Sequence, residues 1–281
     1  MFATIEPGIV HCAAPSSSIL AADESTPFEV YNKTGAAAVL LVCDHASRFI
    51  PRALCGLGLR EEDLCRHIAW DIGIADVTKG LAMLLDAPAV FSQFSRLIID
   101  PNRPHDDELL VPQVSDGVAV PGNRDITPPA HAARIAEFHA PYHVAVEDAL
   151  ASLLQRPKSH TDLLPALISM HSFTPVMDGF ERPWDIGILW DRDERLPLPL
   201  MESFRQRGIA VGDNEPYSGR DAHGYTLRRH AEPRGLPNVL VEVRQDLIDT
   251  PKGVAKWVKV LGEAMVPVLA GLGLLHESAH T

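Results

Sequence analysis

Residues 36–43 read AAAVLLVC, and the polar residues Asp44 and His45 follow this apolar run at once. A continuous run of this length is typical of a strand that is buried on both faces, as in a parallel sheet covered by helices. Functional groups in open α/β sheets gather at the carboxyl ends of the strands. The first polar cluster after this strand is therefore a candidate for a functional site.

Segments with strand and helix character alternate along the rest of the chain. Apolar runs predict strands over residues 87–94, 97–99, 164–170, 186–190, 209–211 and 238–243. Helical spacing predicts helices over residues 74–86, 129–155, 197–207 and 250–270, and residues 105–127 are turn-rich. Because the two kinds of segment alternate without a linker or an internal repeat, we expect a single α/β domain over residues 28–281. Residues 1–27, rich in Ala, Ser and Pro, are expected to form a loose N-terminal arm.

The composition argues against some classes of partner. The 281 residues are 46% hydrophobic and 22% charged, which suits a globular chain with a sizeable core. Lysine and arginine number 25 against 37 aspartates and glutamates, so the formal net charge is −12. A chain this acidic, with its arginines scattered among acids, would be repelled by phosphate backbones and anionic lipid. Nucleic acid and membrane surfaces are therefore not expected as partners.

Two further features favour a cytoplasmic protein. No apolar run approaches the roughly 20 residues of a membrane-spanning helix, and the N-terminus shows no secretory signal. The four cysteines, at positions 12, 43, 55 and 65, form no CxxC pair. We expect them to be reduced, incidental thiols rather than a disulfide framework or a cysteine zinc site.

His45 and His171 each lie at the end of a separate apolar strand, with Asp44 and Asp71 as the acids nearby. A metal ligand needs a neutral imidazole that the scaffold holds rigidly, and strand ends provide such positions. A single histidine is more often a surface or capping residue than a ligand. Neither lies in an HxxH, HxxE or HExxH motif, because Arg48 occupies the third position after His45. Two histidines at equivalent strand ends nevertheless favour a metal site.

Arg96 and Asp100 bracket an apolar segment, and Asn102 and Arg103 follow as the chain leaves the sheet. A guanidinium next to a run of apolar residues needs an anion to meet. Its fork of donors matches a carboxylate or a developing oxyanion. The alternative is a structural ion pair, in which Arg96 or Arg103 binds Asp100 or Asp106.

Glu242 interrupts the last apolar strand, between Val241 and Val243. Strand alternation places its side chain opposite to those of its neighbours, so it points either to a wet face or inward to a partner. An inward carboxylate beside a metal-bound water would serve as a general base, because the pKa of such a water can fall to about 7. The sequence allows both orientations.

Two other polar segments follow predicted turns or strand ends. Residues 225–230 bring Tyr225, Arg228 and His230 close together, either as part of a site or as a solvated basic strand. Residues 213–217 form a polar loop at a strand end that is equally compatible with a plain turn. Ser47 and Ser172 lack a GxSxG elbow, and neither GxGxxG nor GxxxxGK[ST] is present. Serine hydrolases and nucleotide-binding proteins are therefore poorly supported.

Polar motifs follow nearly every predicted strand in a fixed order. They are CDHAS at 43–47, Ile50-Pro51, Trp70-Asp71, Ser95-Arg96, DPNRP at 100–104, Met170-His171-Ser172, Gly212-Asp213-Asn214, Gly224-Tyr225 with Arg228 and His230, and VEVRQD at 241–246. This set resembles the N-formylglutamate amidohydrolase family over about residues 28–270. The resemblance implies a fold like that of the zinc carboxypeptidases and aspartoacylases, with a mixed central sheet flanked by helices. It also implies one zinc ion at the strand ends.

The resemblance assigns roles to individual residues. His45 and His171 match zinc ligands, and Asp71 is the candidate for the third ligand because the HxxE glutamate of some relatives is missing. Glu242 matches the glutamate that activates the zinc-bound water, and Arg96 matches the arginine that steadies the carbonyl oxygen as it gains charge. The residues that match substrate-holding positions are Asn102, Arg103, Tyr225 and Arg228.

The activity implied by the resemblance is zinc-dependent hydrolysis of a small anionic N-acyl amino acid, with N-formyl-L-glutamate giving formate and glutamate in histidine degradation. The resemblance also allows another divalent ion in place of zinc. The best-known branch of the family has His-Ser-Gly where this chain has His45-Ala46-Ser47, so the acyl group or the amino acid can differ. The rival hypotheses are a related deacylase or small peptidase, and a binding protein that has lost the metal. A homo-oligomer is among the states that the sequence allows.

Overall fold

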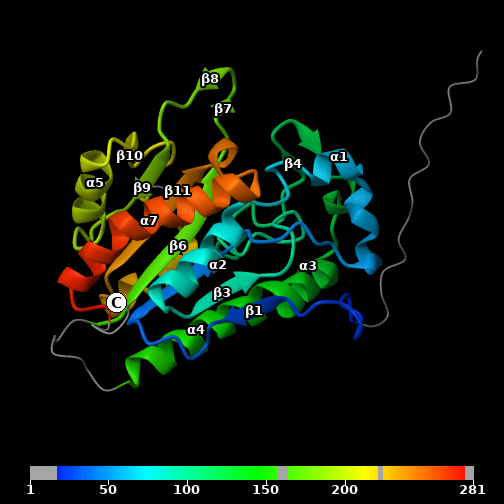
Figure 1. Ribbon diagram of the computed structural model, residues 1–281. Helices are drawn as coiled ribbons and strands as arrows, with labels where there is room; N and C mark the ends of the chain where they lie inside the picture. The colour runs from blue at the N-terminus through cyan, green and yellow to red at the C-terminus, as the bar shows by residue number, and fades with distance from the viewer. Residues whose placement is uncertain (1–17, 157–163, 221–223, 276–281) are drawn as a thin grey trace, which may run out of the picture.

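The computed structural model describes residues 18–156, 164–220 and 224–275 (Figure 1). At its centre lies a mixed sheet of seven strands, in the order β1 (Phe28–Tyr31), β3 (Ala89–Ser92), β2 (Val39–Cys43), β6 (Ala166–Phe173), β11 (Asn238–Arg244), β9 (Ile186–Leu189) and β10 (Val211–Asp213). The four strands from β3 to β11 run parallel, whereas β1 and β9 pair antiparallel with their neighbours β3 and β11. The expected α/β class with a mixed central sheet is confirmed.

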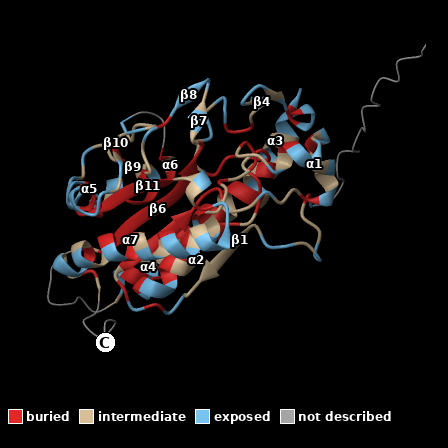
Figure 2. Ribbon diagram, turned by 45° about the horizontal axis from the view of Figure 1, so that its top comes forward, coloured by how far each residue is buried: buried red, intermediate tan, exposed pale blue. Residues whose placement is uncertain are grey.

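The apolar run at the start of the chain body forms β2, whose five residues are fully buried. Leu41 belongs to the core on one face of the sheet, while Leu40 and Val42 belong to the core on the other. Covering both faces with helices explains why this strand needs no polar residue. Figure 2 shows the buried sheet between helices whose outward faces are exposed.

Helices of different length cover the two faces. The first face packs against α2 (Ile74–Leu85), α5 (Pro197–Gln206) and α7 (Pro251–Gly271). The second packs against α4 (Ala140–Leu154) and the short α6 (Tyr225–His230). The remaining helical segments are α1 (Glu61–Leu64), α3 (Pro128–Arg134), the 3-10 turns Arg52–Gly58, Pro121–Asn123, Glu232–Arg234 and Gln245–Leu247, and the π-helical turn Ile135–His139. The single helix expected over residues 129–155 is thus α3, the π turn and α4 in succession.

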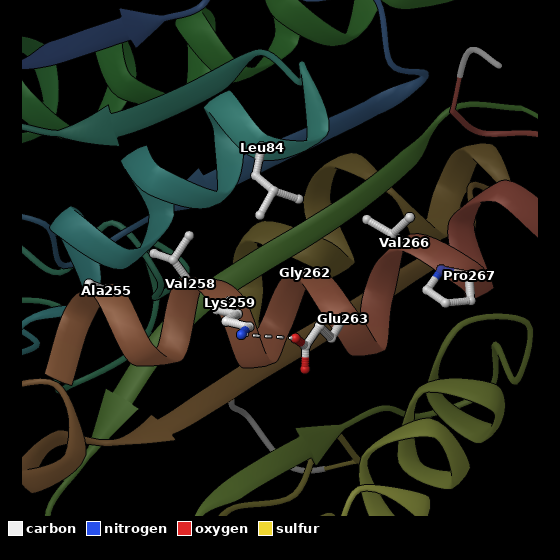
Figure 3. Close-up of a pocket in the computed structure, with 8 residues that line it drawn as sticks. All are labelled: Leu84, Ala255, Val258, Lys259, Gly262, Glu263, Val266 and Pro267. Carbon is white, nitrogen blue, oxygen red and sulfur yellow. Dashed lines mark ion pairs between the residues drawn. The ribbon is translucent and has the colours of Figure 1, made fainter. Parts of the chain in front are cut away.

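Helices α2 and α7 approach each other closely, as Figure 3 shows for Leu84 above the turn of α7 that contains Gly262. A Cβ at Gly262 would lie 2.7 Å from Cδ1 of Leu84, so only glycine fits this position without a shift of the leucine. Beside this contact, Lys259 and Glu263 form an ion pair on the exposed side of α7. The close approach fixes α2, which begins three residues after Asp71.

Two short hairpins extend from the body at the carboxyl-terminal side of the parallel strands. They are formed by β4 (Val114–Ser115) with β5 (Val118–Ala119), and by β7 (Val176–Met177) with β8 (Phe180–Glu181). Within the described ranges, no helix has the length and the apolar character needed to cross a membrane.

Two expectations from the sequence are wrong. Residues 97–99 do not form a strand, although all three are fully buried, because they lie in a turn region that packs on the core without a neighbouring strand. Cys43 and Cys65 are free thiols as expected, but Cys55 is disulfide-bonded, and spacing along the chain could not reveal that contact. Of the expected N-terminal arm, residues 1–17 lie outside the described residues, while the amides of Ile19 and Leu20 donate to Glu137.

Candidate active site

A cavity of about 470 Å³ opens at the carboxyl ends of β2, β6 and β11. Glu242 on β11 lies opposite His171 on β6 in the parallel register, and His45 follows the end of β2. The candidate residues that line the cavity are His45, Asp71, Arg96, Asn102, Arg103, His171 and Glu242. The topology thus brings together residues that lie almost 200 positions apart in the chain.

Three of these side chains point their ligand atoms at a common centre. Nδ1 of His45 and Nδ1 of His171 lie 3.4 Å and 2.9 Å from the same oxygen, Oδ2 of Asp71. The ligand atoms of the three residues all lie within 4.8 Å of one another, and all three side chains are buried. Two imidazole nitrogens with one carboxylate is a donor set that zinc takes in catalytic sites, where a fourth position stays open.

Asp71 reaches this centre because the chain turns sharply before α2. Gly73 has φ of 78° and precedes the first residue of the helix. A Cβ at Gly73 would lie 2.1 Å from the carbonyl oxygen of Ile248, so a larger residue would displace the turn. The backbone amide of Ser172 also donates to Asp71 Oδ2 at 3.2 Å, which ties the carboxylate to β6.

Each histidine contacts a second buried carboxylate through its other ring nitrogen. Nε2 of His45 lies 2.7 Å from Asp100, and Nε2 of His171 lies 2.9 Å from Asp44. Because a carboxylate accepts hydrogen bonds, both rings carry a proton on Nε2 and present Nδ1 to the common centre. Metal-bound histidines are usually oriented in this way, so the residues present fit a divalent cation.

Asp44 holds His171 from a fully buried position. Its carboxylate accepts hydrogen bonds from Tyr142 at 2.7 Å, Ser169 at 3.0 Å and Thr226 at 2.6 Å, besides that from the imidazole. Burial alone would raise the pKa of Asp44, but the hydrogen bond and charge of His171, with smaller contributions from His45 and the Thr226 hydroxyl, keep it below its ordinary value. Sequence reasoning missed the three donors, because they come from α4, β6 and α6 and form no local motif.

The second nitrogen of His171 faces a carboxylate as well, so without a cation the ring is doubly protonated. Burial alone would lower the pKa of His171, but the hydrogen bonds to Asp44 and Asp71 hold it well above its ordinary value. A cation at Nδ1 must therefore displace a proton.

We expect cation binding to release about one proton per site and to weaken about tenfold for each pH unit of acidification. The affinity falls with acidification because the pKa of His171 is raised. At any pH below that pKa a proton on Nδ1 competes with the cation, and the competition ends only when the pH exceeds the pKa. Titration calorimetry with Zn²⁺ in buffers of different ionisation enthalpy measures the released protons. Equal affinity at about pH 6 and pH 8 would show that His171 is not a ligand.

Glu242 points inward, which decides between the two orientations left open by the sequence. Its side chain is buried, and Oε2 has no hydrogen-bond partner among the described residues. Burial raises the pKa of Glu242 to about 7. A carboxylate with that pKa can both take up and release a proton near neutral pH.

Arg96 lies beside the three candidate ligand residues. Its Nη2 donates to Asp100 at 2.7 Å, while Nη1 lies 3.2 Å from Nδ1 of His45 and 3.6 Å from Oδ1 of Asp71. The ion pair with Asp100 that the sequence left as an alternative is therefore present. The guanidinium nevertheless lines the cavity, so the pair holds it in place there.

The remaining substrate candidates fall into two groups. Asn102 and Arg103 line the cavity, with Arg103 paired to Asp107 at 3.0 Å rather than to Asp106. Tyr225 and Arg228 belong to α6, which replaces the basic strand considered from the sequence, and neither is among the described residues that line the cavity.

Comparisons with known proteins find a matching family and similar folds. A sequence model of the N-formylglutamate amidohydrolase family matches residues 37–249. A gene product of Agrobacterium tumefaciens with a known crystal structure is 34% identical, with a TM-score of 0.86 over 91% of this chain and 99% of that chain. The N-formylglutamate amidohydrolase of Ralstonia eutropha JMP134 is 17% identical, with a TM-score of 0.70 over 89% of this chain and 99% of that chain, and so shares the fold. No curated protein sequence matches the chain.

Proposed function

The chain belongs to the N-formylglutamate amidohydrolase family, and we propose on this basis that it hydrolyses the amide bond of a small anionic N-acyl amino acid. N-Formyl-L-glutamate, which would give formate and glutamate, is the first substrate to test. One observation supports the proposal most directly. The three candidate ligand residues line the same cavity as Glu242, whose Oε2 has no hydrogen-bond partner in the part of the chain that the structure describes.

His45, Asp71 and His171 would hold one divalent cation, with zinc as the first choice for this donor set. When bound, the cation supplies Lewis acidity that polarises an acyl carbonyl and acidifies water. Asp44 and Asp100 keep the two imidazoles in the tautomer that leaves Nδ1 available. The carboxylates behind the ligands therefore determine which ring nitrogens face the cavity.

Glu242 would act as the general base and then as the general acid. It takes a proton from the attacking water while the water oxygen bonds to the acyl carbon. It then gives that proton to the amide nitrogen as the C–N bond breaks, which leaves a free amine and a carboxylic acid. The second proton of the water, now on the acid, passes to the amine or to solvent, so that a carboxylate remains. A pKa of about 7 suits both transfers, because the carboxyl can accept and donate at neutral pH.

Arg96 would donate to the carbonyl oxygen as negative charge develops on it. Its guanidinium borders the ligand residues and is held by Asp100, so its direction is set before substrate binds. Asn102 and Arg103 would hold a substrate carboxylate. The guanidiniums of Arg96 and Arg103 would also offset the repulsion between an anionic substrate and a chain of net charge −12.

A substrate panel tests this proposal. We expect N-formyl-L-glutamate to be turned over faster than N-acetyl and N-succinyl amino acids, and Arg103→Met to raise its KM roughly a hundredfold with little change in kcat. The same variant should leave unchanged the KM of an uncharged N-formyl amino acid amide, which has no carboxylate for Arg103 to hold. Preference for another acyl group would favour the related deacylase. Protein that takes up no metal and cleaves nothing in the panel would favour a binding protein that has lost the metal.

A further inference from the structure

A second group of histidines lies behind the cavity, on the side of α4 that faces residues 100–103. His139 ends the π turn, and His143 and Glu147 follow at intervals of four residues, so the three share one face of the helical segment. His230 at the end of α6 completes the group. The three histidines have at most 1% of their surface exposed, and none of them lines the cavity.

Two of these histidines contact the backbone on either side of Asn102. Nε2 of His143 lies 2.9 Å from the carbonyl oxygen of Pro101, and Nε2 of His139 lies 3.0 Å from that of Arg103. A carbonyl oxygen only accepts, so both rings carry a proton on Nε2 and donate it. The loop that presents Asn102 and Arg103 is thus held by two buried imidazoles from the helix behind it.

The contacts behind His143 require an additional proton. Its Nδ1 lies 2.9 Å from Nε2 of His230, whose Nδ1 lies 3.2 Å from the carboxylate of Glu147. Both ends of this chain, the carbonyl of Pro101 and the carboxylate, are acceptors. Two rings that make three hydrogen bonds between two acceptors need three N–H groups, whereas two neutral imidazoles carry only two. When all three hydrogen bonds are made, the His143–His230 pair therefore carries one positive charge opposite the carboxylate of Glu147.

Charged and titratable groups surround this pair on every side. Burial lowers the pKa of both His143 and His230, and the hydrogen bond that His230 donates to Glu147 opposes this for His230. Burial also lowers the pKa of His139 to about 4, so that ring stays neutral and keeps its bond to Arg103. The other charged or titratable groups that face the pair are Arg229 and Tyr225 on α6, Arg234 on the 3-10 turn that follows it, Tyr142 on α4 and Asp44 after β2.

We propose that His139 and His143 are positioning residues for the substrate-binding loop 100–103, and that His143, His230 and Glu147 share a single additional proton. The kinetic part rests on the proposed function, because it assumes that Asn102 and Arg103 hold the substrate. The proton count does not rest on it.

The kinetic test compares two variants of His143. Gln can donate its amide to Pro101 and accept from His230, whereas Leu can do neither. We expect His143→Leu to raise the KM for N-formyl-L-glutamate roughly tenfold with kcat within about twofold of wild type. His143→Gln should restore the wild-type KM. An unchanged KM in His143→Leu, or a KM in His143→Gln as poor as that of the leucine variant, would overturn the positioning role.

The protonation test needs no substrate and keeps its meaning if no substrate of the panel is cleaved or if His143→Leu fails to fold. Nitrogen-15 spectra of histidine-labelled wild-type protein should show the two rings taking up one proton together as the pH falls. Glu147→Gln replaces the acceptor with an amide that can donate to His230 while its oxygen still accepts from Arg234. We expect that variant to take up the shared proton only at lower pH. Independent protonation of both rings, or an unchanged titration in Glu147→Gln, would overturn the shared proton.

Discussion

Replacing Glu242 by glutamine should lower kcat by roughly three orders of magnitude while the fold and the bound cation are retained. The amide has the shape of the carboxyl group but cannot take a proton from water or return it to the leaving nitrogen. The fold and the bound cation should tolerate the change, because Glu242 does not belong to the candidate metal-ligand group. Its Oε2 also has no hydrogen-bond partner to lose among the described residues. Steady-state rates, metal content and a thermal unfolding curve on the same preparation measure the three expectations.

Asp178→Asn is the matched control for this variant. Asp178 also lines the cavity, but it is exposed at the turn between β7 and β8, so loss of its charge should leave kcat within about twofold. A wild-type kcat in Glu242→Gln would exclude the base role. A loss of metal in that variant would instead place Glu242 among the ligands.

The second large effect is expected from the histidines. His45→Ala and His171→Ala should each lose the cation on dialysis and with it nearly all activity, because two remaining ligands bind zinc too weakly to retain it. Metal analysis after dialysis, with the protein concentration measured on the same sample, gives the stoichiometry directly.

His67→Ala separates this effect from a general loss of histidine. His67 lines the same cavity, yet its Nε2 faces Asp116 at 3.5 Å and it does not belong to the converging group. We expect this variant to retain one cation per chain. Full occupancy in His45→Ala or His171→Ala would remove that residue from the ligand set.

Much of the fold could be predicted because its central strands are buried on both faces. The run at 36–43 has no polar interruption, and its last five residues form β2, with Asp44 and His45 directly after the strand. Residues 97–99 are just as apolar but lie in a turn region, since burial alone does not distinguish a strand from a packed turn. A buried segment is a strand only if it pairs with a neighbouring strand. That pairing exists only in the folded protein and cannot be read from an apolar run.

The site was predictable where a residue carries chemistry of its own and unpredictable where it acts through another. His45, His171 and Glu242 stand out because polar groups are rare beside such strands. In the sequence Asp44 stands out only as an acid near a histidine, and nothing marks Tyr142, because its role depends on a hydrogen bond across 98 positions. The orientation of the two imidazoles depends on contacts between residues far apart in the chain, which no local sequence pattern predicts.

The X-ray absorption spectrum of zinc-loaded protein tests the central claim most directly, since it reports which side chains surround the ion. We expect a single class of zinc bound by two imidazoles and at least one oxygen, with one imidazole missing in His171→Ala that is reloaded with zinc and measured without dialysis. A wild-type spectrum with no imidazole around the ion, or one left unchanged by His171→Ala, would contradict the account.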